Sequence, residues 1–316
     1  MADRVHQNPS LIYSVGTQVV VLRNVVASCG RVVHPRGSVG VIVRAPGDLQ
    51  HSYRVRFLDG LEEALRHDEI TMLAHWKEGS IGDSAITAAR HDLFERVIFR
   101  CVVGSRAFGL DTDTSDTDRR GIYLPPADLH WSLYGVPDQL DREETQEQYW
   151  ELQRFLVLAL KANPNVLECL YTPLVEHATP LAQELLAMRS SFLSRTVFQT
   201  YNGYVASQFK KMQADLRNQG AVKWKHVMHL LRLLLSGISV LRHGFVPVKV
   251  EEHREQLLAV KRGEIAWDET EKWRLSLHKE FDAAAAATTL PERPDYEKAN
   301  ALLVKARWLA MEQALP

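Results

Sequence analysis

The first quarter of the chain has the alternation of apolar and polar positions that is typical of β-strands. Short segments rich in Val, Ile, Tyr and Phe are separated by Gly, Pro and Asp turns, at residues 17–25, 37–46, 53–60 and 67–73. In the third segment, Tyr53, Val55 and Phe57 alternate with arginines, so one face is apolar and the other is basic. This spacing predicts a small β-barrel over residues 1–76.

The middle of the chain, residues 77–175, mixes the two periodicities. Apolar spacing predicts a helix followed by two strands, at residues 82–97, 97–105 and 120–126. From Glu147 a strand-like start passes into helical spacing, with one apolar side made of Leu152, Phe155, Leu156, Ala159 and Leu160. Pro164 is expected to end that helix at Asn163. The order predicts an α/β domain with a mixed sheet.

The remainder, residues 176–316, is predicted to be a helical domain. Apolar positions recur at helical spacing in segments 200–216, 223–244, 254–265, 268–287 and 295–313, with no repeat period. The alanine run 283–287 is expected to be a frayed helix end. The whole chain is therefore predicted to be an α+β protein with three domains.

Composition narrows the function classes. The chain is 46% hydrophobic, which is normal for a globular protein. Its formal net charge is −1, so a polyanion would have to bind through local basic patches. Its three cysteines, Cys29, Cys101 and Cys169, lack metal-binding or disulfide spacing, which fits a reducing compartment. With neither a signal-like start nor a membrane-length apolar run, the cytosol is the expected location.

The stretch from Cys101 to Leu124 carries the candidate chemistry. It is not a phosphate-binding P-loop, because Leu110 stands where that motif needs lysine. It is not an EF-hand loop either, since Asp116 replaces the required glycine and Ile122 replaces the final glutamate.

A third interpretation fits every element of the stretch. A strand ends at Gly104 and Ser105, which begin a short helix whose N–H groups can hold phosphate. A second strand is predicted to begin near Ser115, which would place the Asp116 and Asp118 carboxylates on one face. Two such carboxylates repel unless a cation lies between them, and they are suited to Mg²⁺. This arrangement favours metal-assisted phosphoryl or nucleotidyl transfer.

The segment GSRAFGLDTDTSDTDRRGIYL resembles the Gly-Ser and Ser-Asp-x-Asp signature of the DNA polymerase β nucleotidyltransferase superfamily. Together with FLVLALKANPNVLECLY, it is similar to the subgroup that includes RNA-ligase-associated polymerases of bacterial RNA repair. The resemblance covers roughly residues 85–250. It implies a polymerase-β-type catalytic domain, two Mg²⁺ or Mn²⁺ ions, an NTP substrate, an RNA 3′ end as acceptor, and an RNA ligase or other repair protein as partner.

The resemblance also implies roles for single residues. Asp116 and Asp118 would hold the metals, and Gly104 and Ser105 would bind the triphosphate, with Arg106 and Ser115 of the same motif also expected at the nucleotide. A third carboxylate usually comes from a neighbouring strand. Glu143, Glu144, Glu147 and Glu151 are available, and Glu147 is the predicted residue because a strand leads into a helix there.

Two further regions are candidates for binding. The predicted barrel resembles SH3-like barrels of the KOW or tudor type, which contact nucleic acid or protein, although a docking module without a ligand is equally consistent. In the helical region, Lys225, His229 and Arg232 share one helix face and are predicted to bind nucleotide or a polynucleotide end. The alternative is a solvated surface.

The leading hypothesis is a nucleotidyltransferase that adds NMP from an NTP to an acceptor hydroxyl, most simply an RNA 3′ end in RNA repair. Transfer to a protein or a small molecule is one alternative. Another is a non-catalytic nucleic-acid-binding module that retains the fold.

Overall fold

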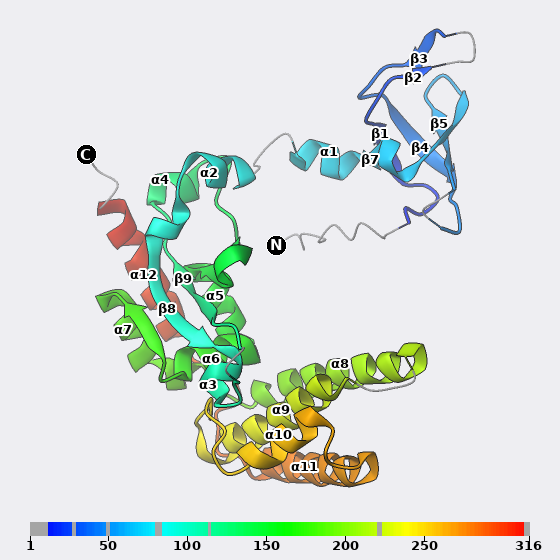
Figure 1. The fold of residues 1–316 in the computed structure, drawn as a ribbon. Helices are drawn as coiled ribbons and strands as arrows, with labels where there is room; N and C mark the ends of the chain where they lie inside the picture. Colours follow the sequence, from blue (N-terminus) through cyan, green and yellow to red (C-terminus); the bar gives the residue numbers. More distant parts are fainter. Residues whose placement is uncertain are drawn as a thin grey trace. The chain divides into compact units, whose positions relative to one another are not determined.

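The computed structural model describes residues 12–26, 30–48, 51–79, 84–112, 115–219 and 223–312 (Figure 1). Cys29 and Asp113 lie outside these ranges. The chain forms two compact units. One comprises residues 1–86 with 133–135, and the other comprises residues 87–132 with 136–316.

The first unit is organised around an antiparallel five-stranded sheet. Its strands, in the order β6-β5-β4-β1-β7, are Glu62–Leu65, Tyr53–Phe57, Val39–Arg44, Gln18–Val21 and Ile70–Met72. The alternation in β5 is as predicted, with Tyr53, Val55 and Phe57 buried and both arginines exposed. A hairpin of β2 (Val25–Val26) and β3 (Val32–His34) and helix α1 (Leu73–Gly79) complete the unit. Strands β6 and β7 lie at opposite edges of the sheet, so the predicted closed barrel is not confirmed.

The second unit contains the mixed sheet that the sequence predicts. Its order β10-β11-β9-β8-β12 corresponds to Gln139–Arg142, Glu147–Glu151, Asp118–Tyr123, Val97–Val103 and Val175–Ala178. Strands β9 and β11 are parallel, whereas the other neighbours are antiparallel. The region after residue 175 was expected to be only helical, yet β12 extends the sheet there. Three of its four residues are exposed, so an edge strand formed without apolar alternation.

Six helices within the described residues, α2 to α7, follow α1 in the chain. They span Ser84–Arg90, Gly104–Phe108, Ala127–Trp131, Leu152–Leu160, Pro164–Tyr171 and Pro180–Ala187. The predicted apolar side of α5 is buried, with Leu152, Phe155 and Ala159 fully inaccessible. The expected role of Pro164 is wrong, because α5 already ends at Leu160 and Pro164 is the first residue of α6. Asn163 caps α6, with Oδ1 accepting from the N–H groups of the next turn.

The C-terminal helices α8 to α12 span Thr196–Gln219, Trp224–His243, Arg254–Arg262, Trp267–Ala287 and Tyr296–Glu312. Helix α9 is largely buried and packs against α8, α10 and α11 (Figure 1). The alanine run does not fray, since it continues α11 and buries Ala284. Within the part of the chain that the structure describes, no helix has the length and apolar character needed to cross a bilayer.

Candidate functional site

The site is centred where β8 passes into the short helix α3. Strand β8 ends at Val103, whose register partner on β9 is Asp118, and α3 begins at Gly104. Gly104 has a φ of +71°, and a Cβ added there would lie 2.4 Å from Asp118 Oδ2. A side chain at position 104 would therefore displace this carboxylate, and the positive φ also favours glycine there.

The loop that precedes β9 is held by hydrogen bonds to Arg106 on α3. Its guanidinium donates to the carbonyl oxygens of Ser115 at 2.7 Å and Asp116 at 3.3 Å. The Ser115 hydroxyl accepts from the Thr112 N–H at 2.9 Å. Because β9 begins only at Asp118, the predicted strand start near Ser115 is wrong, and Asp116 lies exposed in the loop.

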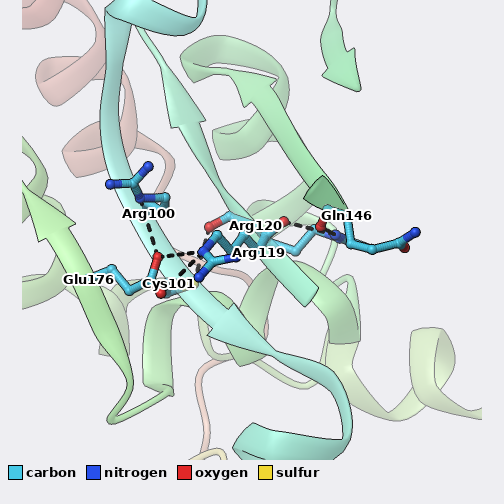
Figure 2. Close-up of polar contacts among 6 residues, drawn as sticks. All are labelled: Arg100, Cys101, Arg119, Arg120, Gln146 and Glu176. Atoms are coloured by element: carbon cyan, nitrogen blue, oxygen red, sulfur yellow. Dashed lines mark hydrogen bonds and ion pairs between the residues drawn. The ribbon is translucent and has the colours of Figure 1, made fainter. Parts of the chain in front are cut away.

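Arg120 is the charged neighbour of Asp118 on β9. One of its guanidinium nitrogens lies 3.6 Å from Asp118 Oδ1, while another donates to the carbonyl oxygens of Arg119 and Gln146 (Figure 2). The Asp118 side chain remains 35% exposed. Its carboxylate is therefore partly neutralised by Arg120 but still accessible to a further cation.

Glu147, the predicted third carboxylate, is placed differently. It pairs in register with Arg119 on β9, and neighbouring positions of a strand face opposite sides of the sheet. Glu147 therefore shares the face of Arg119, and Asp118 and Arg120 occupy the other. On the Arg119 face, Glu176 lies between two guanidinium groups, at 2.9 Å from Arg119 and 3.3 Å from Arg100 (Figure 2).

The structure does not bring the predicted metal ligands into one cluster. Among the residues described, no group of three or more His, Cys, Asp or Glu side chains is arranged to hold a metal ion. Asp118 is the carboxylate that lies against Gly104, and Asp116, two residues before it, is exposed in the preceding loop.

The three predicted binding residues on α9 have different environments. Lys225 is exposed, whereas Arg232 is buried, donates to Glu168 Oε1 at 2.6 Å, and stacks 3.7 Å from the ring centre of Phe108. His229 is mostly buried, and this burial, with help from neighbouring cations including Arg232, lowers its pKa to about 4. Arg232 thus joins α9 to α3 and α6, whereas Lys225 faces solvent.

Two cations near the site were not singled out from the sequence. Arg254 Nε donates to the Gly109 carbonyl oxygen at 2.7 Å, and Lys261 Nζ donates to that of Leu110 at 3.2 Å. Both come from α10, seven residues apart and so on one helix face. The i, i+7 spacing of the two cations is visible in the sequence. Their hydrogen-bond partners are not, because Gly109 and Leu110 lie 145 and 151 residues away in the chain.

The arrangement has the elements of an anion and cation site. Gly104 and Ser105 present the first N–H groups of α3 beside an accessible carboxylate. Arg254 and Lys261 place positive charge at the other end of the same helix. A single accessible carboxylate beside backbone N–H groups offers an oxygen ligand for a cation and donors for a phosphate group.

Comparisons with known proteins identify the family of the chain. The family model described as "RNA repair pathway DNA polymerase beta family" (RlaP) matches residues 80–305. An uncharacterized protein of Bacillus subtilis (strain 168), YcgL, is 28% identical over 156 residues. That alignment covers 48% of this chain and 59% of YcgL. Since the family match includes both β8–α3–β9 and the helices that contact it, the chain belongs to the RNA repair pathway DNA polymerase beta family.

Proposed function

We propose that the protein is a metal-dependent nucleotidyltransferase that transfers NMP from an NTP to the 3′ hydroxyl of an RNA. The observation that carries the proposal is the close approach of Gly104 and Asp118, in a chain whose family is a polymerase β family of RNA repair. In the reaction the 3′ oxygen forms a bond to the α-phosphorus. The bond from that phosphorus to the bridging oxygen breaks, and pyrophosphate leaves.

In this proposal Gly104 and Ser105 bind the triphosphate through N–H groups, and Arg106 and Ser115 contribute from the adjoining loop. Asp116 and Asp118 hold Mg²⁺ or Mn²⁺, because their carboxylate oxygens are the donors that such ions prefer. The bound metal would neutralise phosphate charge and make the acceptor hydroxyl more acidic. The hydroxyl proton passes to a carboxylate of the site or to solvent.

Two predicted contributions stay predictions within this scheme. Glu147 is the expected third carboxylate, and its register with Arg119 means that it reaches a metal beside Asp118 only if the start of β11 rearranges. Lys225, His229 and Arg232 are the expected nucleotide contacts on α9. Of these, exposed Lys225 is the best placed to meet a ligand without breaking an existing contact.

The partners follow from the same proposal. They are an NTP, an RNA 3′ end and an RNA ligase or other repair protein. For the first unit we keep the SH3-like character predicted from the sequence, with a nucleic acid or protein contact at the exposed basic side of β5 that carries Arg54. If an Arg54→Glu variant binds RNA as tightly as the wild type, the proposal that this side of β5 contacts nucleic acid is refuted.

The direct test is incubation with labelled NTPs, Mg²⁺ or Mn²⁺, and RNA, DNA or the protein itself as acceptor. The expected products are an RNA that is extended at its 3′ end by the labelled nucleotide, and pyrophosphate. Asp118→Asn and Asp116→Asn should each abolish labelling while leaving the thermal midpoint nearly unchanged, since both side chains are solvent-accessible. Equal labelling by the wild type and both variants would refute the proposal.

A further inference from the structure

A groove in the second unit is separate from the site around Gly104 and Asp118. It has a volume of about 580 Å³ and lies between the end of α5, the first turns of α8 and the segment before α12. Its lining includes none of residues 104–109 or 116–120. A volume of this size lies within the range of natural ligand sites.

The groove is lined by two cations and by none of the described acids. Lys161 and Arg293 both line it and are exposed, and within the described ranges neither has an ion-pair partner. Two acids of the adjoining segment have other cations as partners. Asp295 lies 3.1 Å from Lys298, and Glu292 lies 3.8 Å from Arg195. Since no described Asp or Glu lines the groove, its charge favours an anionic ligand.

Two tyrosines supply flat apolar surface in the same groove. Tyr204 is partly buried, and its hydroxyl accepts from Asn163 Nδ2 at 2.8 Å. Asn163 is itself fixed, because its Oδ1 caps α6. Tyr296, at the start of α12, is 55% exposed. One ring is thus held in place and the other is free to adjust to a ligand.

The floor between these groups is ordered as well. The Thr200 hydroxyl donates to the Lys161 carbonyl oxygen at 2.8 Å, which joins the first turns of α8 to the residue that follows α5. Lys161 therefore projects from a backbone position that is held on both sides, by this bond and by the cap of α6.

Cations alternating with aromatic rings are the means by which proteins bind single-stranded nucleic acid. The cations contact phosphates and the rings stack on bases without regard to sequence. We propose that this groove binds a nucleotide step of single-stranded RNA, with Lys161 and Arg293 at the phosphates and Tyr204 and Tyr296 against the bases. The inference rests on the proposed function, in which an RNA strand is the acceptor, and adds a second contact for that strand.

Binding is measured by fluorescence anisotropy with a 5′-labelled 12-nucleotide oligo(rA), in EDTA and without NTP, between 50 and 200 mM KCl. The full chain carries Lys161→Ala with Arg293→Ala, or the matched control Lys272→Ala with Lys279→Ala, which removes two exposed cations from α11 outside the groove. We expect the groove variant to bind about tenfold more weakly, with the slope of log K against log[KCl] smaller by about 1.4. The control should retain wild-type affinity and slope.

Tyr296→Ala, at an exposed ring, should weaken binding roughly tenfold and leave the salt slope unchanged. AMP, which offers one phosphate and one base, should fail to displace the oligonucleotide at concentrations where unlabelled RNA does. Equal affinity and slope in the groove and control variants would overturn the proposal. So would displacement by AMP as effective as that by RNA, which would assign the groove to a mononucleotide.

These outcomes are distinguishable from those of the transfer assay. Binding is measured without metal or NTP, so it does not depend on catalysis. If the wild type transfers no nucleotide but RNA binding depends on Lys161 and Arg293, the groove stands and the proposed function fails. If transfer occurs and requires Asp118, while the groove and control variants bind RNA alike, the proposed function stands and the groove is refuted.

Discussion

The Cα of Gly104 faces the carboxylate of Asp118 so closely that a methyl group between them would lie 2.4 Å from Oδ2. The contact arises because β8 and β9 are antiparallel and pair Val103 with Asp118, which brings the start of α3 over the start of β9. Residues 14 positions apart are thereby joined in one small volume, where an N–H donor group and an acidic group can act on the same ligand.

Gly104→Ala should displace the Asp118 carboxylate and lower the transfer rate by about 100-fold, since a shift of about 1 Å in a reacting group can cost this much. The matched control is Gly60→Ala, which has a φ of +86° but no atom within 4 Å of the added Cβ. Both changes should lower the free energy of unfolding by about 1 kcal/mol because of the left-handed backbone. Rates are compared with the labelled-NTP assay, and equal rates in the two variants would contradict the steric argument.

The buried pair of Glu168 and Arg232 should be sensitive to loss of one partner. Glu168→Ala leaves the Arg232 guanidinium buried without its carboxylate, which should reduce the free energy of unfolding by about 3–5 kcal/mol. Glu168→Leu combined with Arg232→Met should recover most of that loss, because two apolar side chains leave no unpaired charge.

Urea unfolding of Glu168→Leu, Arg232→Met and the double variant that combines them measures this coupling. The exposed pair Arg242–Glu280 provides the comparison, and breaking it should cost about 0–1 kcal/mol. A double variant as unstable as the sum of the single variants would show that the two charges do not interact.

His229 should make the stability depend on pH. Its folded pKa of about 4 lies below the ordinary value of 6.5, so the imidazole stays neutral in the fold while the unfolded chain takes up a proton. The contribution of His229 to the free energy of unfolding should therefore be constant above about pH 7. As the pH is lowered from 6.5 to 4, this contribution should fall by about 3 kcal/mol at most.

His229→Gln should flatten this part of the profile, measured as urea midpoints from pH 4 to 8. The difference between wild type and variant isolates the group from carboxylates that titrate in the same range. His243→Gln, at an exposed position near the end of the same helix, should leave the profile unchanged. Parallel profiles for His229→Gln and the wild type would mean that His229 titrates normally.

Arg106→Ala should raise the Mg²⁺ concentration needed for half-maximal transfer, because its guanidinium holds the carbonyl oxygens of Ser115 and Asp116 in the loop. Arg106→Lys should recover the effect only in part, since an ammonium lacks the planar geometry that reaches two acceptors. If instead KM for the NTP rises and the Mg²⁺ requirement does not, Arg106 contacts the nucleotide directly rather than positioning the loop.

Local patterns predict the elements that bury one face, but not the ends of those elements. The alternation in β5 and the apolar side of α5 were correctly read from the sequence, because burial of one face imposes a period. Pro164 was misread, since a proline that stops one helix is equally suited to the first position of the next. Strand β12 was missed because an exposed edge strand needs no apolar face.

The candidate site was likewise predictable from the sequence only in part. Its motif, from Gly104 to Asp118, is continuous in sequence and was therefore visible. The positions of Arg232, Arg254 and Lys261 depend on contacts across 64 to 151 residues, which no local spacing encodes. The side of the sheet occupied by Glu147 depends on strand register, and a shift of one residue would reverse it.

The contacts of α10 and α12 decide whether the mixed sheet of the second unit can be transferred to another protein without its C-terminal helices. Arg254 and Lys261 supply donors to carbonyls after α3, and Arg307 on the last helix donates to Glu151, which caps α5. A fragment cut after α6 or α9 would keep every residue of the sequence motif and lose these partners. Swapping this domain between proteins therefore requires an exchange boundary beyond α12, because the shortest fragment that keeps these contacts is the second unit with its complete set of helices.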